Sequence, residues 1–156
     1  MSTFNVPLTL LDPEGGWVNA PVHVHELHGR PVLLHFWTER FAYRQARMAR
    51  LQGLLREFIP RGLQVIGVHT PLFGQEPARP IDTNELEDLV KRLGIHYPVA
   101  ADDGSMATVY GVTSAPAYLL FGGDLRPIAR FQEEESLEEA LRPALAARFA
   151  PDASAP

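Results

Sequence analysis

Cysteine is absent from the 156 residues of this sequence. Its absence excludes disulfide bonds, thiolate nucleophiles and metal sites with cysteine ligands. Lysine is almost absent as well, because Lys91 is the only one among 14 lysine and arginine residues. Acidic residues outnumber the basic ones and give a formal net charge of -5. Nonspecific nucleic-acid binding needs a basic surface, so we expect no nucleic-acid partner.

Long hydrophobic runs are absent too. No apolar stretch approaches the roughly 20 residues that a membrane-spanning helix requires, so we expect no membrane partner. The N-terminal residues carry neither the basic segment nor the apolar core of a signal peptide. These features predict a cytoplasmic protein, although a chain from which a leader had been removed would have the same sequence.

The length predicts one domain with a substantial core, over residues 1–149, followed by a flexible C-terminal tail at residues 150–156. Two almost continuous apolar runs, at residues 32–37 and 63–68, are typical of central strands buried on both faces. From about residue 40 to 58 the apolar residues recur with a helical period. They form one face, which consists of Met48, Leu51, Leu55 and Phe58. Shorter strands are predicted at residues 6–11, 97–100, 117–121 and 128–131.

Two further helices are indicated by their ends. Asp82 offers a capping oxygen, Glu85 follows three residues later, and Gly94 is a well-placed C-terminal stop. The last helix begins with a capping-box pattern at residues 136–139. Pro143 lies inside that helix, so we expect the helix to kink or restart there.

Leaving aside the short segment at residues 97–100, the predicted order of elements is β, β, α, β, α, β, β, α. Helical crossovers between buried strands imply parallel pairing, and the late hairpin supplies antiparallel strands. The fold class is therefore α/β, with a mixed sheet.

Several segments carry a resemblance to a known family. Residues 29–37, the helix after them and residues 62–68 resemble thioredoxin-fold proteins of the TlpA/ResA kind. Four shorter segments are more specific, and they resemble the thioredoxin-like module at the C-terminus of DipZ proteins. That module is also seen fused to NHL-repeat domains. The segments are residues 36–38, 67–71, 92–99 and 110–111. The resemblance spans residues 6 to 148. It implies a thioredoxin fold, in which a central mixed β-sheet is flanked by helices, with an N-terminal strand extension.

In that family a Cys-X-X-Cys motif opens the helix after the first buried strand. Its first cysteine attacks a partner disulfide and its second resolves the mixed disulfide. The matching positions here are Phe41 and Arg44, with Ala42 and Tyr43 between them. Neither side chain can exchange thiols, so the resemblance implies no catalytic residue, no cofactor and a redox-inactive relative of the thiol–disulfide oxidoreductases.

A second family feature faces the motif. The sequence Ser114-Ala115-Pro116 matches the family's cis-proline loop, which presents backbone to an extended peptide. The resemblance therefore implies a cis bond before Pro116 and a retained docking edge. We predict a protein- or peptide-binding module whose binding face consists of Trp37, Arg40, Phe41, Tyr43, Arg44, Ala115 and Pro116.

Two other functions stay open. Arginines beside a helix N-terminus suit carboxylate or phosphate, so an enzyme could act on an anionic small molecule held by Arg44. The alternative for these arginines is a solvated face paired with acids such as Glu39. Phe41 either anchors a partner or folds back into the space that the thiols would occupy. A structural module that forms a homodimer through exposed aromatics is the third function.

The histidines have simpler interpretations. His35 occupies the position where thioredoxins hold a buried Asp, and without a thiol we favour a hydrogen-bonded buried histidine over a proton relay. Residues 22–27 alternate as a strand does, which would place His23 and His25 on one face. No carboxylates converge near them beyond Glu26, so we predict no metal site. The Asp102-Asp103-Gly104 stretch is expected to be a turn rather than a calcium loop.

Overall fold

The computed structural model describes residues 8, 16–27, 29–38, 45–71, 81–132 and 137–149. A six-stranded sheet of order β1-β4-β3-β2-β5-β6 forms its centre. The strands are β1 (Trp17–Val18), β2 (Val32–Trp37), β3 (Gln64–His69), β4 (Val99–Ala101), β5 (Ala117–Phe121) and β6 (Pro127–Gln132). The helices are η1 (Val24–Glu26), α2 (Gln45–Phe58), η2 (Ile59–Arg61), α3 (Thr83–Leu93), α4 (Ser105–Val109) and α5 (Leu137–Phe149).

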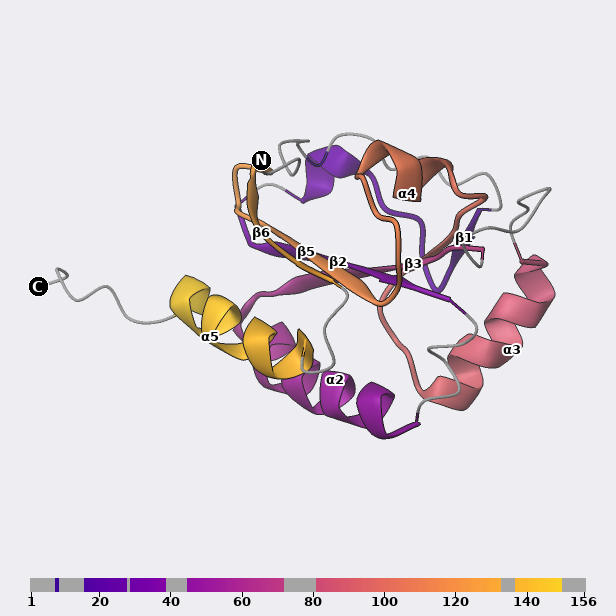
Figure 1. Ribbon diagram of the computed structural model, residues 1–156, viewed down its shortest axis with the longest axis horizontal. Helices are drawn as coiled ribbons and strands as arrows, with labels where there is room; N and C mark the ends of the chain where they lie inside the picture. Colours follow the sequence, from indigo (N-terminus) through magenta and orange to yellow (C-terminus); the bar gives the residue numbers. More distant parts are fainter. Residues whose placement is uncertain are drawn as a thin grey trace, which may run out of the picture.

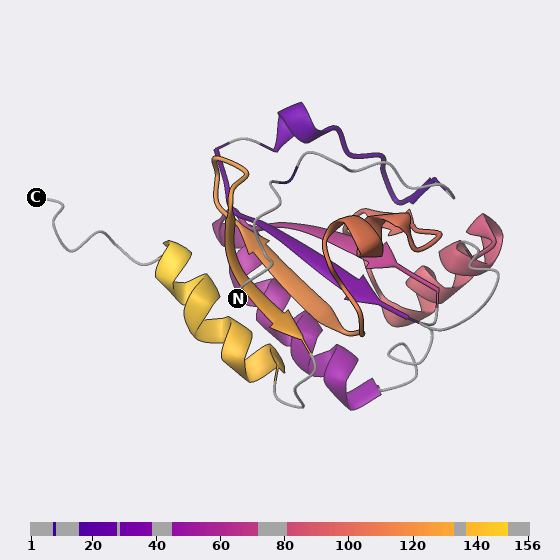
Figure 2. The ribbon, with the colours of Figure 1, turned by 45° about the horizontal axis from the view of Figure 1, so that its top comes forward.

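The sheet is mixed, as the crossover pattern predicted. β2, β3 and β4 are parallel, whereas β5 pairs antiparallel with both β2 and β6. Helices α2, α3 and α5 lie on one side of the sheet and α4 lies on the other (Figure 1). Figure 2 shows α5 alongside α2, and an ion pair between Arg142 and Glu57 joins these two helices. The predicted α/β thioredoxin-like architecture is therefore confirmed.

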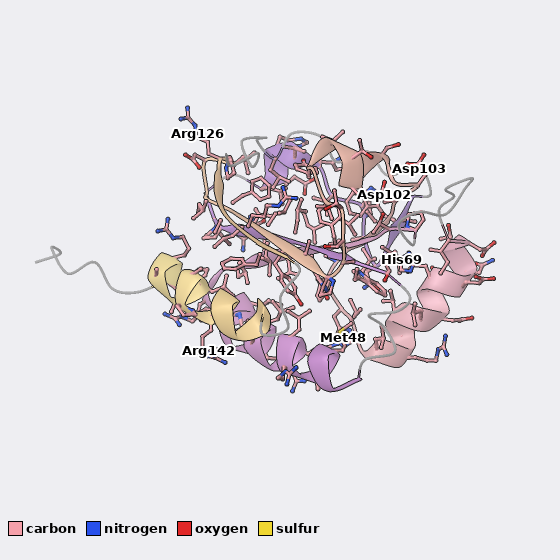
Figure 3. All side chains as sticks on the ribbon, in the orientation of Figure 1. Met48, His69, Asp102, Asp103, Arg126 and Arg142 are labelled. Carbon is pink, nitrogen blue, oxygen red and sulfur yellow. The ribbon has the colours of Figure 1, made fainter. Side chains whose placement is uncertain are left out.

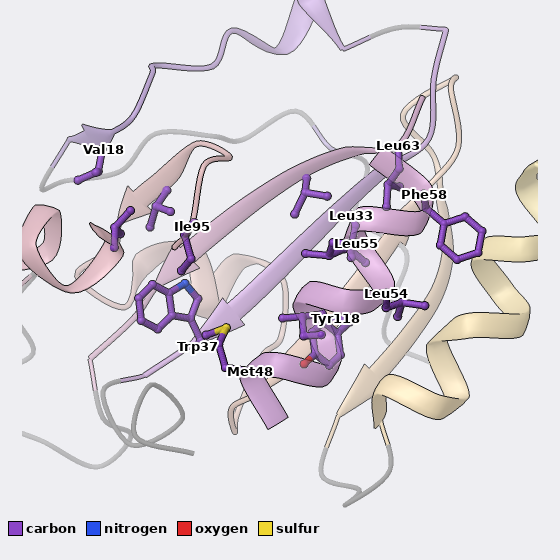
Figure 4. Packing of buried hydrophobic residues seen from close by; sticks show 14 of the residues in the cluster. Val18, Leu33, Trp37, Met48, Leu54, Leu55, Phe58, Leu63, Ile95 and Tyr118 are labelled. Carbon is purple, nitrogen blue, oxygen red and sulfur yellow. The ribbon is translucent and has the colours of Figure 1, made fainter. Parts of the chain in front are cut away.

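Strand β2 supplies both layers of the core. All six of its residues are buried, as the continuous apolar run predicted. Leu33 and Trp37 pack toward the helical layer of α2, α3 and α5, where α2 contributes the apolar face found in the sequence, Met48, Leu51, Leu55 and Phe58 (Figure 4). Leu34 and Phe36 point to the opposite face, where they pack with residues of α4. Each face of β2 is covered because its side chains alternate.

The N-terminal part differs from its prediction. Residues 22–27 do not form a strand: Glu26 N–H donates to the His23 carbonyl at 2.9 Å and Leu27 N–H to Val24 at 3.0 Å, which makes the three-residue turn η1. Local bonds replace ladder bonds because no neighbouring strand pairs with this segment in the described sheet. The N-terminal strand extension is β1 instead, which pairs antiparallel with β4. The predicted strand at 6–11 lies outside the described residues, apart from Leu8.

The predicted helix ends are found in α3. Asp82 Oδ1 accepts hydrogen bonds from Asn84 N at 2.8 Å and Glu85 N at 3.4 Å, and Gly94 ends the helix with φ of 68°. Helix α5 runs through the exposed Pro143 without restarting. At an exposed position water can bind the carbonyl that proline leaves without a donor. The residue before α5 and the tail at 150–156 lie outside the described residues. No described helix has the length and apolar character needed to cross a membrane.

Candidate functional site

The C-terminal ends of the parallel strands bring several polar residues together. In open α/β sheets, ligands bind where such strand ends meet. Trp37 at the end of β2 lies opposite His69 at the end of β3, and His69 lies opposite Ala101 of β4. We call this region the strand-end site. Its members are Trp37, Thr38, His69, Thr70, Asp102 and the loop of residues 114–116.

Backbone hydrogen bonds continue past the strand ends and hold this site together. Thr70 N–H donates to the Trp37 carbonyl at 2.9 Å, and Asp102 N–H donates to the His69 carbonyl at 2.9 Å. Thr38, His69, Thr70 and Asp102 are at most 4% exposed. Figure 3 shows His69 and Asp102 at the same end of the sheet. The polar groups of the site therefore lie beneath the surface.

Trp37 is fully buried, with 0% of its surface exposed. Its ring meets His69 edge to face, with 4.8 Å between ring centroids, and its Nε1–H has no hydrogen-bond partner. Trp37 is one of the predicted binding residues; its side chain is buried in this structure, and a role in binding stays a prediction. Trp37 supports the site from below, because the helical layer covers its ring.

Gly67 makes room for this tryptophan. A methyl group added to Gly67 would lie 3.2 Å from Trp37 Nε1, 3.1 Å from Tyr97 Cε1 and 3.3 Å from Val99 Cγ2. All three distances are shorter than ordinary van der Waals contacts, so the two rings are packed against bare backbone. The sequence showed Gly67 only as part of a family-like stretch.

We expect Gly67→Ala to lower the free energy of unfolding by about 1–3 kcal/mol, the usual cost of overpacking a core. Urea denaturation at neutral pH measures this change. Gly53→Ala is the matched control, because a methyl group there meets nothing within 4 Å. Gly53 lies within α2, so alanine should stabilise the protein by roughly 0.5–1 kcal/mol. Equal effects of the two substitutions would show that Gly67 is not tightly packed.

His69 is the site residue that sequence analysis missed, because it was assigned to the loop after a strand. It is 3% exposed, and among the described residues neither ring nitrogen has a hydrogen-bond partner. Burial lowers the pKa of His69 from 6.5 to about 4, and the polar backbone of His69 itself only partly opposes this effect. The imidazole is therefore neutral at physiological pH. The available signal was a polar residue directly after a buried apolar run.

His35 lies in the middle of the sheet. It is fully buried and stacks on Tyr118 of β5, with 4.8 Å between ring centroids and 18° between ring planes. Its backbone lies opposite Gly67 in β3. The prediction of a buried histidine is confirmed, and the predicted hydrogen bond of its ring stays a prediction.

The loop before β5 enters the sheet beside the end of β2, since Ala117 lies opposite Phe36. The peptide bond between Ala115 and Pro116 is cis. Ser114 and Ala115 are partly exposed, whereas Pro116 is buried. Of the predicted binding residues that the structure describes, Ala115 alone is partly accessible to a partner. The other predicted binding residues, Arg40, Phe41, Tyr43 and Arg44, lie outside the described residues.

Asp102 has a structural role. Its side chain is fully buried and accepts two backbone hydrogen bonds, from Met106 N at 2.9 Å and from Ala107 N at 3.1 Å. It therefore satisfies two of the free N–H groups at the start of α4. Asp103 accepts from Ser105 N at 2.9 Å, and its hydrogen bonds to Ser105 lower the pKa of its carboxyl group. The predicted turn at these residues is present.

The described residues contain no group of three or more His, Asp or Glu side chains that could hold a metal ion. The rings of His23 and His25 stack at a centroid distance of 5.9 Å. Both are exposed; His25 lies in η1 and His23 is the residue before it, so neither lies on a strand. They therefore offer neither converging carboxylates nor a rigid sheet face for metal coordination.

Comparison with known proteins places this geometry in a family. A model described as the AhpC/TSA family matches residues 4–131. A segment of 92 residues is 32% identical to Protein DipZ of Mycobacterium tuberculosis and to that of Mycobacterium bovis; it covers 56% of this chain and 13% of each DipZ protein. The chain therefore corresponds to a small part of the DipZ proteins.

Solved structures show the same fold. A thioredoxin-like protein solved in its oxidised form has a TM-score of 0.71 at 20% identity, with 94% of this chain and 98% of that chain covered. A thiol-disulfide isomerase from Corynebacterium glutamicum has a TM-score of 0.70 at 20% identity, with 94% and 97% covered. The family resemblance drawn from the sequence is confirmed. The chain belongs to the AhpC/TSA family and is a thioredoxin-like relative of the thiol–disulfide oxidoreductases, although it contains no cysteine.

Proposed function

We propose that this protein binds an extended peptide or protein segment at the strand-end site and has no thiol–disulfide activity. The observation that carries the proposal is the position of the loop at residues 114–116. This loop lies beside the end of β2, with Ser114 and Ala115 partly exposed. It is present in a chain whose family normally places two cysteines at the positions of Phe41 and Arg44.

The lack of redox activity follows from chemistry. Thiol–disulfide exchange requires a thiolate that attacks a disulfide and a second thiol that releases the partner. The chain has no sulfur nucleophile, because cysteine is absent and methionine is a thioether. Binding of a peptide does not need a thiol, so loss of the cysteines removes the reaction and leaves docking intact.

The described part of the site favours a shallow surface. Trp37 and His69 are buried, and the pairing of β5 with β2 holds the loop in place above the core. A partner would meet Ala115 together with Arg40, Phe41, Tyr43 and Arg44 from the preceding junction. Aromatic and arginine side chains are the residue types that contribute most to binding energy at interfaces.

Peptides selected on the native chain from a random library test this proposal. We expect their affinity to fall at least tenfold in the Phe41→Ala plus Arg44→Ala variant, since truncated anchors typically cost 1–2 kcal/mol or more. Arg126→Ala is the control, because Arg126 is exposed in the turn between β5 and β6, at the opposite end of β5 from the loop at residues 114–116. Equal affinity of the double variant and the native chain would move binding away from this site.

An insulin-reduction assay with dithiothreitol tests the other half of the proposal. The native chain should give no turnover above the dithiothreitol background. Turnover that depends on the protein would contradict a redox-inactive role. The alternative of a homodimer remains a prediction, and sedimentation at high concentration checks it.

A further inference from the structure

A second surface feature shares no residue with the strand-end site. A groove of about 560 Å³ lies between one flank of α2 and the C-terminal end of α3. Gln52 of α2 crosses its base, where Gln52 Nε2 donates to the Leu93 carbonyl at 2.6 Å. The apolar part of the groove includes Leu55 and Tyr97, and Ile59 at its edge is 42% exposed. We call it the basic groove.

The permanently charged residues that line the basic groove are all cationic. Arg56 comes from α2, and Lys91 and Arg92 come from α3; none of the described residues that line the groove is acidic. In the described part of the chain none of the three permanent cations forms an ion pair. This cluster stands in a protein whose formal net charge is -5.

Helix dipoles offset part of this positive charge. The C-terminal end of a helix carries roughly half a negative charge, which cations in the last turn stabilise. Two such ends, of α2 and α3, offset about one positive charge, so a surplus remains from Arg56, Lys91 and Arg92. The terminal carbonyls of α3 also have partners within the protein, since Gly94 N–H donates to the Lys91 carbonyl and Ile95 N–H donates to the Val90 carbonyl. The surplus is therefore free to attract an external anion.

We propose that the basic groove binds an acidic peptide segment of a partner protein, one that carries an apolar anchor between its carboxylates. The cations come from two separate elements, which suits spaced negative charges. The exposed Ile59 and the partly exposed Tyr97 suit a leucine-sized anchor, and burial of such a side chain adds to the charge attraction. This site is additional to peptide docking at the strand ends, and it is tested with different variants.

Fluorescence anisotropy with the full chain tests the proposal. The probe is a fluorescein-labelled eight-residue peptide of glutamates with two central leucines. We expect Arg56→Gln and Arg92→Gln each to weaken binding by about twofold to fivefold, as for other solvent-exposed charge pairs. Binding should also weaken as salt rises. A probe with serine in place of leucine should bind less tightly, because it lacks the apolar anchor.

Arg50→Gln is the matched control, because Arg50 is an exposed arginine on the same helix outside the groove. Its affinity for the probe should equal that of the native chain. No measurable binding by the native chain, or an equal loss in all three variants, would overturn the proposal. The proposal would also be overturned if the native chain formed a dimer and bound no probe, while the Arg56→Gln plus Arg92→Gln variant was monomeric. That outcome would identify a second copy of the chain as the occupant of the groove. Variants of Phe41 and Arg44 should bind the probe normally.

Discussion

Replacing Asp102 with alanine should lower the free energy of unfolding by about 3 kcal/mol. The carboxylate accepts hydrogen bonds from Met106 N and Ala107 N and is completely buried. A hydrogen bond to a charged group contributes roughly 1.5–3 kcal/mol, and a buried donor left without a partner adds a desolvation penalty. Alanine would leave both N–H groups unsatisfied where water cannot easily reach them. Urea denaturation measures this loss of free energy, provided that the native chain and the variant have the same m-value.

Two other variants separate this effect from a general disturbance of the turn. Asp102→Asn retains one of the two acceptor oxygens and loses the charge, so one N–H group keeps a weaker hydrogen bond while the other meets the amide NH2 group; its loss should be smaller than that of alanine. Asp103→Ala removes a hydrogen bond to Ser105 N near the surface and should cost about 1 kcal/mol, as for an N-cap. If Asp102→Ala and Asp103→Ala destabilise the protein equally, the buried carboxylate has no special role in holding α4 on the sheet.

Acid should destabilise the protein through His69. The pKa of His69 is 6.5 when unfolded and about 4 in the folded protein, because burial disfavours the imidazolium. Between these two values the unfolded chain binds more protons than the native chain, so stability falls as pH falls. The full contribution is present above pH 6.5. It is lost progressively down to about pH 4, and the total loss is ~3 kcal/mol at 1.36 kcal/mol per pKa unit.

The pH dependence of a variant isolates this contribution from those of the carboxylates. The His69→Leu variant has no imidazole to protonate. Between pH 7 and pH 4 the native chain should therefore lose ~3 kcal/mol more free energy of unfolding than the variant loses. His25→Leu removes an exposed histidine and is the matched control for the substitution. A His69→Leu protein with the same slope as the native chain would show that His69 does not titrate in this window.

Asp102 and His69 also bear on the docking proposal, because both lie beneath the strand ends. Asp102 N–H donates to the His69 carbonyl, and His69 packs against the Trp37 ring. Substitution of either side chain is expected to change the stability of the protein near the proposed docking region. Peptide affinity should therefore be measured on variants only at pH values and temperatures where they remain folded.

Much of the fold could be predicted from local sequence signals. Continuous apolar runs identified β2 and β3, the helical period identified the buried face of α2, and Asp82 and Gly94 marked both ends of α3. These predictions succeeded because caps and buried faces depend on neighbours within a few residues along the chain. The prediction for residues 22–27 failed because an alternating pattern becomes a strand only where another strand pairs with it.

The candidate site was less predictable. The loop at residues 114–116, which the family resemblance pointed to, lies beside the end of β2, and its role in binding stays a prediction. The resemblance also named Trp37 as a binding residue, but it could not show how far that side chain is buried, because burial depends on what covers a side chain. Here Gly67 and Tyr97 come from distant parts of the chain and enclose the ring. Nothing in the residues adjacent to Trp37 carries that information.

The sequence by itself determined that this family member cannot perform thiol exchange, because no arrangement in space supplies a missing sulfur atom. It also determined the long apolar strands β2 and β3 and the helices α2, α3 and α5 between and after them, since hydrophobic periodicity is a property of the chain. Only the tertiary structure decided that His69 is neutral, that Trp37 is a buried support and that Arg56 joins Lys91 and Arg92 in the basic groove. Burial and the summed charge of a surface depend on residues that are distant in sequence and meet only when the chain folds.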